Sequence, residues 1–181
     1  MTSTPPRPPL VDNDFRLRAP ARETPFHVVL VEPEIPPNTG NVARLCAATC
    51  ARMHLVHPLG FQVDEKAVRR AGLDYWHLVD WTEHPNFAAC DAARPSGARR
   101  WFFTGKATRS FLDVSYSLGD YLVFGKESVG LDLDQVGAQP DELVAIPTLG
   151  AVRSLNLANA VALALYEGLR QNGCLTPNAA G

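Results

Sequence analysis

The chain has 181 residues, of which 46% are apolar and 20% charged, and its formal net charge is −2. This composition is typical of a single globular domain with enough residues for a sizeable core. It excludes a membrane-spanning protein, because no apolar run approaches the roughly 20 residues that a transmembrane helix needs, and it gives no overall positive charge that would by itself indicate nucleic-acid binding.

The N-terminus has no apolar stretch of the kind found in secretory signals. Its first 25 residues, "MTSTPPRPPLVDNDFRLRAPARETP", are rich in proline and lack apolar periodicity, so we expect a disordered extension. The sequence then predicts a folded domain over residues 26–173 and a flexible tail over 174–181.

Short apolar runs and helical spacings alternate along the folded domain. The runs predict strands at 26–32, 53–57, 77–81, 100–105, 121–125 and 143–147. Helices are predicted from about residue 41, at 64–73, at 86–95 and at 154–171. Strands that alternate with helices indicate an α/β fold, with a mostly parallel sheet and helices on both faces.

Polar and glycine-rich stretches follow four of the predicted strands. They are "NTGN", "TGKATR", "GKESVG" and "PTLGAVRS". In parallel sheets, ligands bind at the carboxyl ends of the strands, so these four loops are expected to meet at one ligand-binding edge. Loops need glycine in any case, but that need does not explain the polar side chains that accompany the glycines.

Familiar phosphate-binding and hydrolytic motifs are missing from the sequence. It contains no G-x-G-x-x-G or P-loop pattern, and no G-x-S-x-G or H-E-x-x-H pattern. His27, His54 and His57 lie at the ends of predicted strands, where a structural role is the more common one. A small-molecule hydrolase is therefore disfavoured, because no nucleophile stands out.

The four cysteines, Cys46, Cys50, Cys90 and Cys174, include no C-x-x-C pair. Cys46 and Cys50 are four residues apart on a predicted helix, which suits burial better than a zinc site. We therefore expect reduced thiols, a cytoplasmic location and no metal.

Four stretches carry a resemblance that covers roughly residues 26–173. They are "VVLVEPEIPPNTGNVARLCAAT", "RRAGLDYW", "YLVFGKESVGL" and "IPTLGAVRSLNLANAVALALYE". In this order they resemble the SPOUT RNA methyltransferases, and more closely the minimal TrmL-type tRNA 2′-O-methyltransferases. The resemblance implies a C-terminal trefoil knot and a homodimer. It also implies S-adenosylmethionine as methyl donor, S-adenosylhomocysteine as product, and the anticodon stem-loop of tRNA as substrate.

The resemblance further implies which reaction is catalysed and which residues take part. The expected reaction is methylation of the ribose 2′-hydroxyl of cytidine or uridine 34, with tRNA-Leu isoacceptors as the expected substrates. The expected catalytic residues are Asn38, Asn41, Arg44, Glu127, Ser154 and Asn156. The expected cofactor-binding residues are Thr104, Gly105, Gly125, Ile146, Ser154 and Leu155.

Several of these residues have a structural alternative. Glu127 is predicted to orient Arg44 or Asn38, or else to pair with Lys126. Ser154 is predicted to cap the long C-terminal helix, to line the methyl-transfer site, or to do both. Asn38 or Asn41 would cap the first helix, whose first turn is predicted to carry Arg44.

RNA binding is expected to use a composite basic surface, which a dimer would duplicate. Its predicted members are Lys66, Arg69, Arg70, Lys106, Arg109, Arg153 and Tyr166. A solvated helix face would explain the basic residues equally well, and a place in the core would explain Tyr166. The remaining alternatives are a ribose methyltransferase acting on another RNA, such as rRNA, and a non-catalytic knotted RNA-binding module.

Overall fold

A computed structural model describes residue 17 and residues 19–61 and 76–176. The predicted helix at 64–73 lies outside these residues, as do most of the predicted extension, 1–25, and most of the predicted tail, 174–181.

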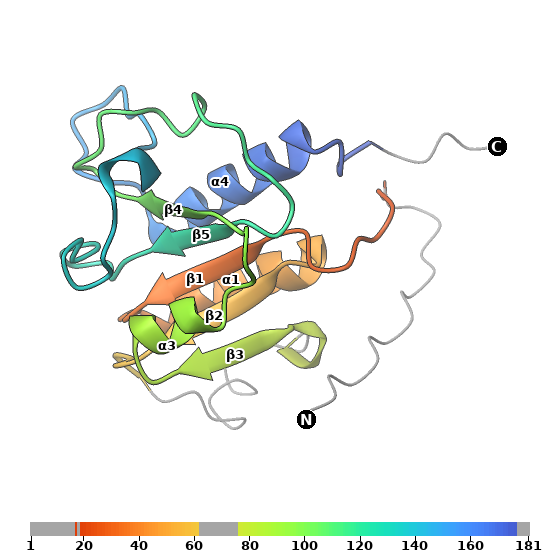
Figure 1. The fold of residues 1–181 in the computed structure, drawn as a ribbon, viewed down its shortest axis with the longest axis horizontal. Coiled ribbons are helices and arrows are strands. Elements are labelled where there is room, and N and C mark those ends of the chain that lie inside the picture. The colour runs from red at the N-terminus through yellow and green to blue at the C-terminus, as the bar shows by residue number, and fades with distance from the viewer. Residues whose placement is uncertain (1–16, 18, 62–75, 177–181) are drawn as a thin grey trace.

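A six-stranded parallel sheet forms the centre of the described structure, in the order β3-β2-β1-β5-β4-β6 (Figure 1). Its strands are β1 (His27–Val31), β2 (Arg52–Val56), β3 (Trp81–His84), β4 (Arg100–Phe103), β5 (Tyr121–Phe124) and β6 (Leu143–Val144). The predicted fold class, a parallel α/β sheet, is confirmed.

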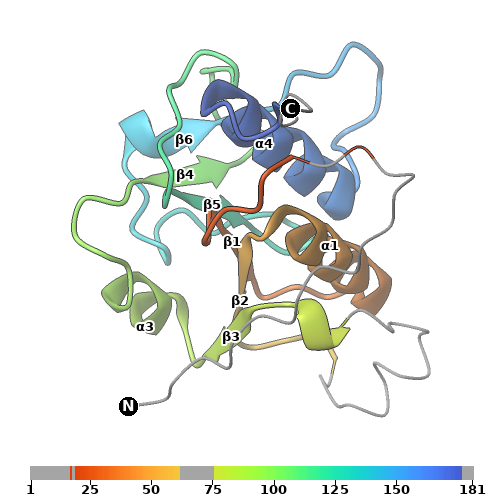
Figure 2. The same ribbon diagram turned by 90° about the vertical axis from the view of Figure 1, so that its right-hand side faces the viewer.

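Helices cover both faces of this sheet, as predicted (Figure 2). The helices are α1 (Pro36–Thr49), α3 (Phe87–Ala92) and α4 (Leu157–Gln171), with 3-10 turns at Trp76–Leu78 and Pro140–Glu142. α1 and α4 pack against each other over one face, and α3 lies on the other. None of the helices in the described part of the chain combines the length and the apolar character that crossing a bilayer requires.

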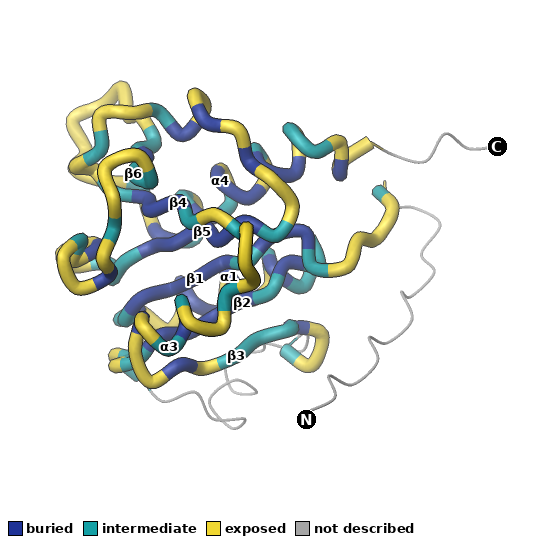
Figure 3. Tube along the Cα trace, viewed as in Figure 1, coloured by how far each residue is buried: buried dark blue, intermediate teal, exposed yellow. Residues whose placement is uncertain are grey.

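The side chains of β1 alternate between two hydrophobic cores, one on each face of the sheet. Val28 and Leu30 are fully buried under α1 and α4, whereas Val29 and Val31 are buried on the α3 side. A strand buried on both faces reads as a continuous apolar run, which is why this strand could be found from sequence. Figure 3 shows β1, β2 and β5 mainly in dark blue and much of the loop after β6 in yellow, so the exposed polar stretches lie at the rim of a buried sheet centre.

Three predicted boundaries are wrong. α1 begins at Pro36 rather than near Asn41, because prolines are well tolerated at the first positions of a helix. The strand predicted at 77–81 is a 3-10 turn at Trp76–Leu78, and β3 begins only at Trp81. α4 begins at Leu157, after an extended segment that includes Ser154.

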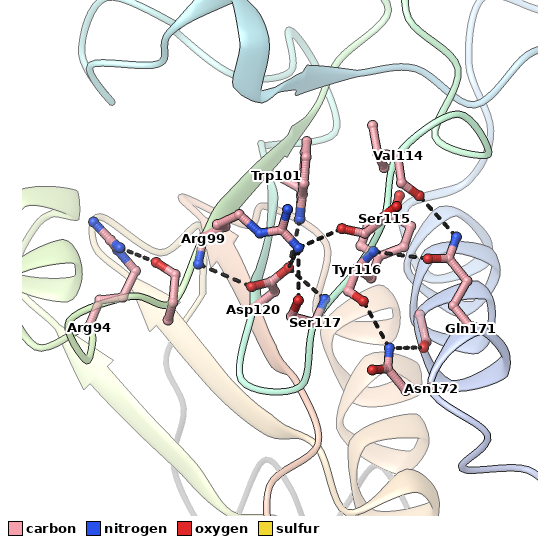
Figure 4. A network of polar contacts seen from close by, with 12 residues as sticks. Arg94, Arg99, Trp101, Val114, Ser115, Tyr116, Ser117, Asp120, Gln171 and Asn172 are labelled. Carbon is pink, nitrogen blue, oxygen red and sulfur yellow. Dashed lines mark hydrogen bonds and ion pairs between the residues drawn. The ribbon is translucent and has the colours of Figure 1, made fainter.

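The amino end of the sheet is held together by a buried carboxylate, that of Asp120 (Figure 4). Asp120 is 1% exposed and accepts hydrogen bonds from the Trp101 indole at 3.0 Å and from the backbone N–H groups of Arg99 and Ser117. The Arg99 guanidinium forms an ion pair with the same carboxylate at 3.3 Å. These contacts satisfy a buried charge with several donors, which is what its burial requires.

The last turn of α4 is attached to the loop that precedes Asp120. The Gln171 amide accepts from the Tyr116 N–H at 2.9 Å and donates to the Val114 carbonyl at 3.0 Å, and Asn172 donates to the Tyr116 carbonyl at 3.1 Å (Figure 4). The C-terminal end of α4 is therefore fixed at the amino end of the sheet, so the helix runs from the ligand-binding edge to the opposite edge.

Candidate functional site

The parallel register brings the predicted cofactor loops together at the carboxyl edge of the sheet. Phe103, the last residue of β4, pairs with Phe124 of β5 and with Val144 of β6. The stretches that follow these strands contain Thr104, Gly105, Gly125 and Ile146. These four residues therefore leave three neighbouring strands at one edge, as the sequence predicts for a ligand site.

The start of α1 lies beside the β5 strand end and is held by the carboxylate of Glu127. Glu127 Oε2 accepts from the Glu34 N–H at 2.8 Å, and Oε1 accepts from the Ile35 N–H at 3.3 Å and from Asn38 Nδ2 at 2.9 Å. A negative charge at a helix N-terminus is favourable, because it interacts with the positive end of the helix dipole.

Two prolines at the start of α1 contribute to this arrangement. Pro36 and Pro37 occupy the first helical positions of α1, and the residue before them, Ile35, provides no side-chain cap. Proline has no N–H, so two of the donors that normally need a cap are absent. Neither Asn38 nor Asn41 caps α1, so the predicted cap is wrong; Glu127 from a distant loop instead binds the N–H groups of Glu34 and Ile35, just before the helix.

Asn38 connects α1 to the start of α4. Its side chain is 6% exposed, donates to Glu127, and accepts from Asn156 Nδ2 at 2.9 Å. Asn156 in turn caps α4, because its Oδ1 accepts from the Ala158 N–H at 2.9 Å and the Asn159 N–H at 3.4 Å. The cap was predicted to be Ser154, which lies two residues too early and is exposed.

We call this chain of contacts, Glu127–Asn38–Asn156, the amide bridge. It joins the loop after β5, the first turn of α1 and the first turn of α4, so three segments distant in sequence are set against one another. Asn has one acceptor and one donor group in its amide, and in Asn38 both are used within the bridge. The orientation of that amide is thereby fixed by its two partners.

A second set of contacts ties the same loops together nearer the solvent. Glu34 accepts from the Ser128 hydroxyl at 2.9 Å and from the Ser128 N–H at 3.0 Å. Lys126 forms an ion pair with Glu32 at 2.7 Å, and its ammonium group holds the pKa of the Glu32 carboxyl below the usual value. Lys126 is therefore paired with Glu32, and Glu127 is left to hold Asn38.

Arg44 lies on the exposed side of α1, and Asn41 shares that side. Residues three apart are neighbours on a helix surface, so the two side chains leave α1 in the same direction. The sequence predicted Arg44 in the first turn of this helix. Because α1 begins at Pro36, Arg44 lies in the third turn instead. The amide bridge fixes the helix from which Arg44 projects.

Gly125 is required by the packing of its own loop. A Cβ added to Gly125 would lie 2.3 Å from the Gly130 carbonyl carbon and 2.4 Å from the Leu131 nitrogen. Gly130 has φ +76°, in the left-handed region that glycine adopts without strain. Both glycines of "GKESVG" therefore shape a tight loop, within which Lys126 and Gly130 form a bridge.

The loop from Pro147 to Ser154 is exposed throughout and includes two exposed apolar side chains, Leu149 and Val152. Arg153 connects it to the loop after β5, since its guanidinium donates to the Ser128 carbonyl at 3.2 Å. The position of Arg153 next to this loop places Ser154 and Leu155 between the two loops and the start of α4. No hydrogen bond of the Ser154 hydroxyl occurs within the described residues.

Residues 25–166 match the SpoU rRNA Methylase family. The chain belongs to that family. A tRNA (cytidine(34)-2'-O)-methyltransferase of Acidovorax sp. (strain JS42) is 47% identical over 154 residues, which cover 84% of this chain and 95% of the relative.

Two solved structures extend the comparison of this SpoU-family chain. One, concerned with 2-OH methylation of C/U34 on tRNA, has 47% identity and a TM-score of 0.76, and the match covers 82% of this chain and 96% of the other. The other is the SpoU methyltransferase AviRb from Streptomyces viridochromogenes in complex with the cofactor AdoMet. It has 26% identity and a TM-score of 0.68, and the match covers 91% of this chain and 63% of that one.

The predicted RNA-binding residues of this SpoU-family chain are exposed wherever the structure describes them. Lys106, Arg109, Arg153 and Tyr166 are all exposed, and Tyr166 is on α4. The guanidinium of Arg109 lies 5.9 Å from the centre of the Trp101 ring and donates to the Asp141 carbonyl at 3.3 Å. Lys66, Arg69 and Arg70 lie outside the described residues.

Sequence reasoning missed two residues of the carboxyl edge. Glu34, which receives both Ser128 donors, lies between prolines in a stretch where an acidic residue is usually solvated. Thr39 is 2% exposed, and its hydroxyl has no hydrogen-bond partner within the described residues. Neither position carries a pattern from which its burial or partner could have been read.

Proposed function

We propose that this chain transfers a methyl group from S-adenosylmethionine to the ribose 2′-hydroxyl of the wobble nucleotide, cytidine or uridine 34, of tRNA. The amide bridge is the observation that carries the proposal, because it locks the start of α1 and the start of α4 together at the edge where parallel sheets bind ligands. The relatives that cover nearly the same length and act on this position of tRNA support the same substrate.

The strand ends around Gly125 fit a cofactor that is bound mainly by backbone groups. The loop after β5 is closed tightly by Gly125 and Gly130, and the ends of β4 and β6 lie next to it. Thr104, Gly105, Ile146 and Leu155 would surround the cofactor there, with Gly125 shaping the loop and Ser154 at the rim. S-adenosylmethionine supplies a methyl carbon made electrophilic by its bond to a sulfonium sulfur, and the residues named here need no metal for the transfer.

Arg44 and its neighbours act on the other reactant, the ribose. In the transfer an O–C bond forms, the C–S bond breaks, and the hydroxyl proton leaves. A guanidinium remains protonated at all relevant pH values, so Arg44 polarises the hydroxyl oxygen and binds the adjoining phosphate rather than taking the proton. The proton passes to phosphate or to water. Asn41, on the same side of α1, offers an amide to the RNA.

The residues of the amide bridge position these groups. Glu127 and Asn156 hold Asn38, and Asn38 holds the first turn of α1, so the direction in which Arg44 projects is set before RNA binds. Such preorganisation lowers the entropic cost of reaching the reactive geometry. Ser154, next to the start of α4, is placed to contact the ribose or the cofactor.

We also propose that the C-terminal part of the chain forms the trefoil knot of the SPOUT fold. β6 lies at the outer edge of the sheet, beyond β4, whereas α4, which follows it, packs against α1 and β5 near the middle. The segment between β6 and α4 must therefore travel back across the carboxyl edge. A knot would hold that segment around the cofactor and would explain why so many polar residues gather there.

A homodimer and a cytoplasmic location complete the proposal. Leu163 and Tyr166, 47% and 46% exposed, lie three residues apart on α4 and form an apolar patch that a second copy would cover. Dimerisation would also duplicate the basic side chains available to the anticodon stem-loop. Four unpaired cysteines are consistent with a reducing compartment.

The direct test uses methyl-labelled S-adenosylmethionine and unfractionated tRNA. We expect label in a 2′-O-methylated pyrimidine nucleoside, which mass spectrometry of nuclease fragments should place at position 34 of tRNA-Leu isoacceptors. Ribosomal RNA should be offered in parallel. Label only in ribosomal RNA would mean that the proposed reaction is correct but that the substrate is rRNA and not tRNA. Binding of the cofactor without transfer to either RNA would favour a non-catalytic RNA-binding protein.

A further inference from the structure

Three histidines form a ladder across neighbouring strands on the face of the sheet that carries α3. His27 is on β1, His54 on β2 and His84 on β3. His27 Nδ1 lies 2.9 Å from His54 Nε2, and His54 Nδ1 lies 2.9 Å from His84 Nε2. His54, the middle member of the ladder, and His84 are 4% and 8% exposed, so both are removed from water.

A thiol completes this group. Cys90, on α3, is 1% exposed, and its Sγ, with one ring nitrogen each from His54 and His84, belongs to a set of atoms that all lie within 4.8 Å of one another. Within the described residues the Cys90 thiol has no hydrogen-bond partner. Two imidazole nitrogens and a sulfur, converging from three different elements, are the ligand types that Zn²⁺ binds most often.

Burial keeps the His54 imidazole and the Cys90 thiol uncharged, so a bound cation is inferred from the geometry alone. Burial lowers the pKa of His54 to about 2, with further lowering from the neighbouring His27 and His84, so His54 is neutral and its nitrogen can act as a ligand. Burial raises the pKa of the Cys90 thiol to about 12. A thiol in such surroundings stays protonated and inert unless a metal ion displaces its proton.

A bound metal would also fix which ring nitrogen of each histidine in the ladder carries its proton. A neutral imidazole carries one N–H, so His54 can donate from Nε2 to His27 Nδ1 and keep Nδ1 as a bare lone pair. In the metal-free protein His84 Nε2 then donates to His54 Nδ1; a bound metal would move the His84 proton to its Nδ1 and leave Nε2 bare. A metal-bound histidine usually donates its other N–H to a fixed acceptor, and His27 would be that acceptor for His54.

We propose that His54 Nδ1, His84 Nε2 and Cys90 Sγ bind a Zn²⁺ ion, with His27 as the positioning residue of His54. Tetrahedral zinc holds two nitrogen ligands about 3.3 Å apart, given bond lengths of about 2.0 Å. The His54–His84 contact has to widen by roughly half an ångström from its present 2.9 Å. A water molecule fills the fourth position, and it can enter through the surface hollow lined by His57, Glu83, His84 and Pro85.

The ion would act as a structural link. It would join β2, the edge strand β3 and the six-residue helix α3. It lies on the face opposite α1 and takes no residue from the amide bridge, so the proposal stands or falls independently of the proposed methyl transfer. The sequence suggested no metal, because the three ligands are separated by 30 and 6 positions and match no spacing motif.

Co²⁺ is the probe that tests the ligand set, because it replaces Zn²⁺ and is coloured. The full chain, freed of metal with a chelator and kept reduced, should bind one Co²⁺ per chain. It should then show a thiolate-to-cobalt charge-transfer band in the near ultraviolet and the intense visible bands of tetrahedral cobalt. Cys90→Ser should lose the charge-transfer band.

Cys46→Ser is the matched control. Cys46 is equally buried and its pKa is also raised to about 12, but it lies in α1 on the other face of the sheet. This variant should keep the band. If Cys46→Ser loses the band and Cys90→Ser keeps it, or if the unaltered chain gives no band with stoichiometric Co²⁺, the proposed site is wrong.

His27→Gln tests the positioning role and remains informative if Cys90→Ser fails to fold. Its cobalt complex should keep the charge-transfer band, because all three ligands remain, while its affinity for Co²⁺ should fall by about 10- to 100-fold. Unchanged affinity would contradict the role of His27. Loss of the band in His27→Gln would mean that the ligand set is different from the one proposed.

Discussion

The two ends of the sheet are each held by a carboxylate, and the surroundings of the two carboxylates differ. At the amino end, Asp120 is 1% exposed and receives its donors from residues 3 to 21 positions before it. At the carboxyl end, Glu127 is only partly buried and receives donors from Glu34, Ile35 and Asn38, about 90 positions away.

This difference separates a stabilising network from a positioning one. The Asp120 contacts are enclosed and satisfy a buried charge, so their main consequence is the stability of the loop and of the end of α4. The Glu127 contacts lie beside exposed loops and set helix α1, from which Arg44 projects. We therefore expect changes at the amino end to lower stability and changes at the carboxyl end to lower activity.

Replacing Asp120 should give the largest change in stability. Asp120→Ala leaves the Trp101 N–H and the Arg99 guanidinium without their buried acceptor, which should cost about 3–5 kcal/mol of unfolding free energy. Chemical denaturation measures this loss. The control is Asp113→Ala, an exposed carboxylate in the same loop, which should change the free energy of unfolding by about 0.5 kcal/mol or less. Equal losses of unfolding free energy in the two variants would contradict the stabilising role assigned to Asp120.

Replacing Arg44 should give the largest change in activity. Arg44→Ala should lower the rate of methyl transfer at least about 100-fold, as expected for removal of a group that stabilises charge in the transition state. Calorimetry should show cofactor binding changed by little, since Arg44 acts on the ribose. Arg170→Ala removes another exposed arginine, at the far end of α4, and should keep full activity. A parallel loss of binding and transfer in Arg44→Ala would contradict its assigned role.

Glu127 should show an intermediate effect that separates catalysis from stability. Glu127→Gln keeps one acceptor for Asn38 but loses the charge at the start of α1 and places an amide N–H towards backbone donors. We expect kcat to fall about 10-fold, or roughly 1.4 kcal/mol, with the free energy of unfolding changed less. If stability falls and kcat stays constant, the amide bridge would be structural, like the Asp120 network.

Arg153 should show the smallest effect. Its contact with the Ser128 carbonyl is exposed, and its proposed partner is phosphate. Arg153→Ala should weaken tRNA binding by about 1 kcal/mol or less and reduce the salt dependence of binding by about one ion contact. Binding titrations at several salt concentrations would reveal this, and an unchanged slope would exclude Arg153 from the RNA surface.

Elements with a strong local pattern were predictable from the sequence. β1 and β5 are almost entirely apolar, and the polar loops that follow the strands were correctly predicted to meet at one edge of the sheet. The start of α1 was predicted near residue 41, too late by about one turn, although proline suits the first helical positions and Pro36 and Pro37 occupy them. β3 was misplaced because "HLVDW" has the composition of a strand but forms a 3-10 turn at its beginning.

Contacts between distant segments were harder to predict. Asn38 and Glu127 were both singled out, with several possible partners for Glu127, and only the fold shows that its partner is Asn38. Ser154 looked like the cap of α4, since serine is a preferred capping residue, but Asn156 is equally suitable and lies next to the first helical residue. The histidine ladder required the order of β1, β2 and β3, which no local pattern contains.

Methyl transfer to a tRNA-Leu anticodon stem-loop offers the most direct test of the central claim. Two RNAs should be compared, identical except that one carries a 2′-deoxyribose at position 34. The account predicts that the ordinary RNA takes up label, and that the deoxy RNA binds with similar affinity and takes up none. Equal labelling of the two RNAs would show that the 2′-hydroxyl of the wobble nucleotide is not the methyl acceptor and would contradict the proposed function.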